Sequence, residues 1–286
     1  MSRTPFRFAE GTAVVTGAAG GMGEHVARLL AGRGSDLVLV DRDGVALDKV
    51  AAEIRAKHPG LSVTTETVDL AERDAVDALA TRILAGHPEI RLLVNNAGVA
   101  LGGDFARLTI DEFDWVLDVN FRAPVRLTHA LLPALTARPG AHVVNVSSLF
   151  GLIAPPGQSA YCSSKFALRG FSEVLRAELA QVGATVTTVH PGGIRTNIAT
   201  SARVGVNIPA EEAERGQRDF EKLLTFPADK AAAQIVEAVE KRRPRLLIGA
   251  SAKIPDALAR IAPANSLRLF AKLVGASGRR TAAGAR

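Results

Sequence analysis

The chain of 286 residues is poor in cysteine, tyrosine and tryptophan, with one residue of each kind. A single cysteine excludes an internal disulfide framework and a cysteine cluster for zinc. The six histidines are scattered along the chain without the spacing of metal ligands. We therefore expect no metal site and no disulfide-stabilised fold.

Long apolar runs are also missing. No uninterrupted apolar stretch approaches the roughly 20 residues that a membrane-spanning helix needs. The first residues, MSRTPFRFAEGTAVV, carry no continuous apolar stretch after their basic residues, unlike a secretory signal. We expect a cytoplasmic protein.

Positive charge is unevenly spread. The net charge is +6, but the segment from Lys241 to the end holds eleven Lys and Arg residues and one acidic residue, Asp256. The rest of the chain is therefore mildly acidic. Because the basic charge is confined to one end, we expect no nucleic-acid partner.

Short apolar runs alternate with helix-like patterns through most of the chain. The strand-like runs are 13–17, 36–40, 61–68, 92–96, 142–148, 185–190 and 245–249, and the helical patterns are 22–33, 44–57, 71–85, 111–135, 159–181 and 227–243. Runs that are almost wholly apolar are typical of parallel strands covered on both faces. The alternation predicts an α/β fold, a doubly wound parallel sheet of about seven strands with helices on both faces, in one domain over residues 1–250.

A glycine-rich loop, TGAAGGMG (16–23), separates the first strand from the first helix. In a doubly wound sheet this turn lies at the crevice where ligands bind. Gly17 suits a tight turn, while Gly21 and Gly23 let backbone approach a pyrophosphate at the helix N-terminus. An ordinary flexible loop is the alternative interpretation.

The end of the second strand bears on the choice of dinucleotide. Asp41 is the last residue of LVLVD, where a carboxylate accepts hydrogen bonds from ribose hydroxyls and repels a 2′-phosphate. The next residue, Arg42, is able to pair with that phosphate instead. We expect NAD as cofactor, with NADP as the alternative.

Four polar residues form a candidate catalytic set. Tyr161 and Lys165, in YCSSK, are four apart on one helical face. The ammonium is expected to lower the phenol pKa and make an acid/base pair, although a surface contact is the alternative. Ser147 and Ser148 end the fifth strand, and we favour Ser148 for holding a substrate oxygen. Asn120 lies within the long helical pattern, where it is placed to hold a water.

These motifs, with NNAG (95–98) and HPGGIRT (190–196), resemble those of short-chain dehydrogenases/reductases over residues 8–250. The resemblance implies a Rossmann fold, NAD(P)(H) binding and an Asn120–Ser148–Tyr161–Lys165 tetrad. Tyr161 is then the acid/base, Ser148 holds the substrate oxygen, Lys165 binds the nicotinamide ribose, and Asn120 completes a proton relay.

The resemblance also implies a wider cofactor site. Asp69 and Leu70 are expected to bound the adenine, and the NNAG residues to line its ribose. The full set of expected cofactor contacts is Gly17, Gly21, Met22, Gly23, Asp41, Arg42, Asp69, Leu70, Asn96, Ala97, Gly98, Tyr161, Lys165, Pro191, Gly192, Ile194 and Thr196.

We therefore expect hydride transfer between NAD(H) and a small-molecule secondary alcohol or ketone of apolar character, by a homodimer or homotetramer. An NADPH-dependent carbonyl reductase and a non-catalytic NAD(H)-binding redox sensor are the alternatives. Residues 197–226 follow the HPGGIRT motif and are placed to form a lid over the substrate.

The basic C-terminal segment, 251–286, is expected to be a helical extension, divided into short helices by Pro255 and Pro263, that ends in a disordered tail. Apolar residues recur at helical spacing, at Ile254, Leu258 and Ile261 and again at Leu267, Phe270, Leu273 and Val274. They are expected to pack on the body or a dimer contact, or to lie on an anionic membrane surface.

Overall fold

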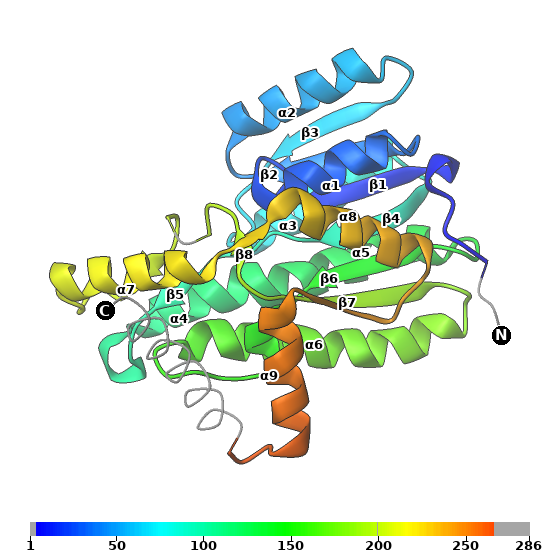
Figure 1. The fold of residues 1–286 in the computed structure, drawn as a ribbon. Coiled ribbons are helices and arrows are strands. Elements are labelled where there is room, and N and C mark those ends of the chain that lie inside the picture. The colour runs from blue at the N-terminus through cyan, green and yellow to red at the C-terminus, as the bar shows by residue number, and fades with distance from the viewer. Residues whose placement is uncertain (1–3, 199, 266–286) are drawn as a thin grey trace, which may run out of the picture.

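Seven strands form one parallel sheet at the centre of the protein (Figure 1), and its five inner strands are buried along most of their length. The computed structural model describes residues 4–265 except residue 199. Across the sheet the strands are ordered β3 (Val63–Thr67), β2 (Asp36–Asp41), β1 (Thr12–Thr16), β4 (Ile90–Asn95), β6 (His142–Val146), β7 (Thr185–Pro191) and β11 (Arg245–Ile248). The predicted strands and their parallel arrangement are confirmed.

Helices cover both faces of this sheet, as the sequence predicts. One apolar core lies under α1 (Gly21–Ala31), α2 (Gly44–Lys57) and α8 (Ala228–Glu240). The other lies under α3 (Arg73–Gly86), α5 (Ala123–Thr136) and α6 (Ser159–Ala180). The five inner strands therefore bury side chains on both sides, which explains their largely apolar sequences, whereas the edge strand β3 buries Val63 alone.

The strand order reverses beside β1. This strand pairs with β2 on one side, with Val14 opposite Val38, and with β4 on the other, with Val14 opposite Leu93. In a doubly wound sheet the ligand crevice lies at such a switch point, outside the carboxyl ends of the strands. The glycine loop follows β1 at this edge.

The helical pattern over 111–135 proves to be two helices. α4 (Ile110–Leu117) begins with a capping box between Thr109 and Glu112, and a π-helical turn (Asp118–Arg122) joins α4 to α5. The prediction of one long helix was wrong at this turn, because apolar periodicity continues through a wide turn that adds one residue. The turn carries Asn120.

The predicted lid segment is held at both ends by two-residue ladders. β8 (Ile194–Arg195) pairs with β10 (Phe226–Pro227), and β5 (Leu101–Gly102) pairs with β9 (Arg203–Val204). Between β9 and β10 lies α7 (Ala210–Leu223), which has no buried residue and extends from the body (Figure 1).

The last helix among the described residues, α9 (Ala250–Ile261), packs against β11 and the turn Leu149–Gly151. It runs through Pro255, so the prediction that this proline divides the segment was wrong; the helix does end before Pro263. The stripe at Leu267, Phe270, Leu273 and Val274 lies outside the described residues. Within the described part, no helix is both long and apolar enough to cross a membrane.

Candidate active site

The glycine loop requires glycine at several positions. Gly17 and Gly21 have φ of +67° and +56°, in the left-handed region that favours glycine. A Cβ on Gly23 would lie 1.9 Å from the Gly17 carbonyl oxygen, which no side chain allows. The first turn of α1 has no side-chain cap, so its N–H groups are free to receive an anion.

Thr16 connects this loop to the NNAG segment. Its Oγ1 accepts hydrogen bonds from the N–H groups of Asn96 and Ala97, both at 3.1 Å. The Asn96 side chain donates to the carbonyls of Thr16 at 3.0 Å and Gly17 at 3.2 Å. The two segments at the switch point are thus fixed relative to each other.

Asp41 shapes the loop as well as facing the crevice. Its Oδ2 accepts from Ala19 N–H at 3.0 Å, and its Oδ1 accepts from Asp43 N–H at 3.2 Å. The carboxylate therefore holds the loop in place, and Arg42 beside it is exposed. Asp41 thus has a structural role in the loop beside the ligand-binding role expected from the sequence.

Ser148, Tyr161 and Lys165 come together at the carboxyl end of β6. The Tyr161 ring is 9% exposed, and the Ser148 hydroxyl is near enough to lower the tyrosine pKa through a hydrogen bond. The Lys165 ammonium lies 5.7 Å from the centre of the Tyr161 ring and donates to the Val146 carbonyl at 3.0 Å. These three side chains form a compact set with one phenol, one hydroxyl and one cation.

Ser147 has a different place. Its hydroxyl donates to the Lys165 carbonyl at 2.9 Å. A Cβ on Gly151 would lie 2.3 Å from the Ser147 hydroxyl oxygen. Ser147 therefore joins β6 to α6 within the core. Of the two serines, Ser148 is the one beside Tyr161.

Asn120 is fully buried in the π-helical turn. Its side chain exchanges hydrogen bonds with the main chain of Val99, at 2.8 and 2.9 Å, and donates to Ser164 at 3.1 Å. Its Oδ1 and the Lys165 Nζ would each lie 3.2 Å from a Cβ on Gly98. The asparagine thus fixes the NNAG segment against α6, next to Lys165.

The other predicted cofactor residues lie along the same edge of the sheet. Thr196 contacts the glycine loop, since its methyl would be 3.2 Å from a Cβ on Gly21. Gly192 leaves no room for a side chain, because a Cβ there would lie 2.1 Å from Ser251 Oγ. Pro191, Ile194 and Leu70 are buried, Met22 and Ala97 are half-buried, and Gly98 and Asp69 are exposed.

Comparison with known proteins agrees with this geometry. The family model described as short chain dehydrogenase matches residues 11–206. The chain is a short-chain dehydrogenase/reductase. SadH of Mycobacterium tuberculosis, which is named as an oxidoreductase, is 40% identical over 263 residues, 91% of this chain and 93% of SadH. The family resemblance seen in the sequence is confirmed.

Two solved structures similar to this short-chain dehydrogenase/reductase hold nicotinamide dinucleotides. One from Burkholderia phymatum, in complex with NAD, has a TM-score of 0.79 and 28% identity, covering 90% of this chain and 96% of that one. One from Sphingobium yanoikuyae, in complex with NADPH, has a TM-score of 0.74 and 28% identity, covering 91% and 94%. The protein is an NAD(P)-dependent oxidoreductase with a Rossmann fold.

Burial dominates the electrostatics of the dehydrogenase site. It raises the pKa of Tyr161 to about 12, and the Ser148 hydrogen bond offsets only part of that rise. It also lowers the pKa of Lys165 to about 8. We expected the Lys165 charge to lower the tyrosine pKa, and the direction in the structure is the opposite. The reason is that removing the phenolate from water outweighs a cation whose hydrogen bond goes to Val146.

The residues present fit a nicotinamide dinucleotide. The loop offers uncapped N–H groups and glycines where backbone alone fits, which suits a pyrophosphate. Sequence reasoning missed two contributors to this site, Thr16 and His190. Phe150 stands edge-on to Tyr161 with ring centroids 6.1 Å apart. His190 was weighed only as a metal ligand, although its place before Pro191 at a strand end was a signal.

Proposed function

We propose that this protein interconverts a secondary alcohol and its ketone, with Tyr161 as general acid/base and NAD(H) as cofactor. The observation that carries the proposal is the buried phenol of Tyr161 between the Ser148 hydroxyl and the Lys165 ammonium, at the edge where the glycine loop lies. Bound cofactor supplies the hydride or accepts it; the side chains manage the proton and the substrate oxygen.

Each side chain has a separate task in this mechanism. The Ser148 hydroxyl donates to the substrate oxygen as negative charge develops on it. Tyr161, whose pKa burial raises to about 12, is protonated at neutral pH and gives its proton to that oxygen in ketone reduction. Lys165 holds positive charge close to the developing phenolate. Asn120 joins the segment after NNAG to α6 through its hydrogen bonds with Val99 and Ser164, and so supports the position of Lys165.

The preference for NAD rests on Asp41. Its carboxylate lies at the end of β2 and is fixed by two N–H groups, so it is held where a 2′-phosphate of NADP would be repelled. Arg42 is exposed and is the feature that favours the NADPH-dependent alternative.

The substrate is proposed to be apolar. The turn after Ser148 brings Phe150 next to Tyr161, and Leu152 and Ile153, which follow this turn, are buried. Residues 197–226 form the lid, tied on one side by Arg107, which makes a bidentate ion pair with Glu212 at 2.8 and 3.1 Å.

We further propose a cytoplasmic homodimer or homotetramer that contacts anionic membrane surfaces through its C-terminal segment. On α9, Ile254 is 53% exposed and Ile261 is 82% exposed, while Lys253 and Arg260 are exposed beside them. An apolar stripe flanked by cations is suited to the interface of an anionic bilayer.

The proposed reaction is tested with a panel of isopropanol, cyclohexanol and menthol, and of acetone, cyclohexanone and acetophenone, each assayed with NAD(H) and NADP(H). Turnover of a secondary alcohol or ketone with higher kcat/KM for the NAD(H) pair is the expected result. Tight NAD(H) binding without turnover of any compound would support the redox sensor instead.

A further inference from the structure

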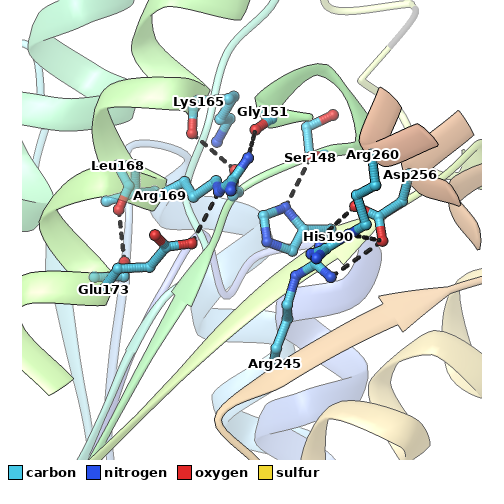
Figure 2. A network of polar contacts seen from close by, with 12 residues as sticks. Ser148, Gly151, Lys165, Leu168, Arg169, Glu173, His190, Arg245, Asp256 and Arg260 are labelled. Carbon is cyan, nitrogen blue, oxygen red and sulfur yellow. Dashed lines mark hydrogen bonds and ion pairs between the residues drawn. The ribbon is translucent and has the colours of Figure 1, made fainter. Parts of the chain in front are cut away.

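His190 lies directly behind Ser148. It occupies the end of β7 before Pro191 and is fully buried, with 0% of its surface exposed. Its Nδ1 is 3.1 Å from the Ser148 carbonyl oxygen. Figure 2 marks this contact with a dashed line. Because a carbonyl oxygen only accepts hydrogen bonds, Nδ1 carries the proton and donates it. In the neutral ring Nε2 is therefore unprotonated.

Ser148 is held at two points as a result. The Phe150 N–H donates to Ser148 Oγ at 3.1 Å, while His190 fixes the carbonyl. Between them the residue is fully extended, with φ −161° and ψ 167°, immediately before the turn Leu149–Gly151. The direction in which the serine hydroxyl points depends on both bonds.

We propose that His190 is a positioning residue of the active site, which holds the Ser148 main chain so that the serine hydroxyl stays beside Tyr161. It acts through Ser148 and touches no reacting atom. The proposal rests on the function proposed above, in which Ser148 holds the substrate oxygen. A displacement of about 1 Å in such a group lowers turnover on the order of 100-fold.

Three charged groups face His190, each from a different element. Burial is the largest cause of its lowered pKa, and Arg245 from β11 and Arg169 from α6 lower it further, against Asp256 from α9, to about 4. Arg245 is itself paired with Asp256 at 2.5 and 3.1 Å, and Arg169 with Glu173 at 2.9 Å (Figure 2). The ring thus stays neutral at working pH, with its proton on Nδ1.

Two buried nitrogens in this network, one a hydrogen-bond acceptor and one a donor, lack partners within the described part of the chain. His190 Nε2 is an acceptor, Arg245 Nε–H is a donor, and neither has a hydrogen-bond partner among the described residues. Nε2 points away from Ser148, because the two ring nitrogens lie on different sides of the imidazole. Arg245 is ion-paired with Asp256, so the charged network that faces His190 extends through β11 to α9.

Two substitutions separate positioning from packing. In His190→Asn the side-chain amide nitrogen takes the place of Nδ1 and donates to the Ser148 carbonyl. In His190→Leu the bulk is largely kept and the donor is lost. The control is His142→Leu, which removes another fully buried histidine at the far end of β6, where its nitrogens contact Thr185 and Thr187.

Tyr161 supplies a readout that needs no substrate. It is the only tyrosine in the chain, so tyrosine labelled with carbon-13 at the ring carbon bearing the hydroxyl gives one NMR signal. That signal senses the hydrogen bond with Ser148. Turnover is followed with the panel compound on which the unmodified protein is most active, and NAD binding by fluorescence titration.

His190→Leu is expected to shift the Tyr161 signal and to lower kcat about 10- to 100-fold, with the Kd for NAD unchanged. His190→Asn is expected to keep the signal in place and to restore most of kcat. His142→Leu is expected to lower the melting temperature without moving the signal.

Two results would overturn the proposal. One is a folded His190→Leu protein with the original signal and kcat. The other is equal loss in the Asn and Leu variants, which would assign His190 to packing. If the unmodified protein turns over no compound of the panel, the proposed function fails, and the NMR comparison still decides the role of His190.

Discussion

Replacement of Lys165 by Met is expected to stabilise the cofactor-free protein at neutral pH while abolishing turnover. Lys165 is 3% exposed, and burial lowers its pKa from 10.5 to about 8. A tenfold change in proton affinity corresponds to about 1.4 kcal/mol, so keeping this ammonium charged at neutral pH costs the folded state about 3 kcal/mol.

Part of that gain is lost with the hydrogen bond. Met has similar length and no charge, but it leaves the Val146 carbonyl without the donor that Lys165 supplies at 3.0 Å. Such a bond contributes about 1 to 2 kcal/mol. The net stabilisation is then about 1 to 2 kcal/mol, equivalent to a rise in Tm of several degrees for a domain of this size.

The pH dependence distinguishes this cause from improved packing. The folded pKa lies below the unfolded one, so between about 8 and 10.5 the unfolded chain binds more protons than the folded chain. The original protein gains stability as pH rises through this window, and the advantage of Lys165→Met shrinks.

Urea denaturation of both proteins across this pH range measures the difference in unfolding free energy. Lys57→Met, at an exposed position at the end of α2, is the matched control. Its difference in unfolding free energy from the original protein is expected to stay constant across this pH range. A Lys165→Met protein that is less stable than the original at neutral pH refutes the reasoning. So does a difference in unfolding free energy between these two proteins that stays constant with pH.

Three further outcomes are expected. Tyr161→Phe keeps NAD binding, because the ring still packs on Phe150, but loses about 100- to 10,000-fold in kcat; steady-state kinetics at near-original rates would contradict this. Asp41→Asn narrows the kcat/KM preference for NAD over NADP roughly tenfold by removing one charge, and an original protein that prefers NADP ends the NAD assignment. The full chain cosediments with phosphatidylglycerol vesicles at low salt, and a double Ile254→Ser, Ile261→Ser variant binds less; no sedimentation of the original chain removes the membrane proposal.

The sheet and its helices were predictable because each rests on local pattern. Strands buried on both faces have to be apolar throughout, and the order of elements alone determines a doubly wound sheet. The need for glycine at positions 17 and 23 was also predictable, because a strand, a glycine-rich loop and a helix in succession are typical of a dinucleotide-binding turn.

Features that depend on contacts across the fold were not predictable. The wide turn at Asn120 keeps the apolar period of a single helix. The direction of the Tyr161 pKa follows from how much water is removed, which spacing to Lys165 does not report. Pro255 lies inside α9, where it is buried and the next residue, Asp256, is ion-paired with Arg245 on β11.

The isolation of α7 has a consequence for how this protein changes over evolution and in the laboratory. None of its fourteen residues is buried, and the chain enters and leaves the segment through short ladders anchored on the body. The buried core therefore places no packing constraint on α7, whose tie to the body is the ion pair of Glu212 with Arg107. Residues 210–223 can therefore change in sequence while the sheet, the glycine loop and the residues around Tyr161 stay as they are.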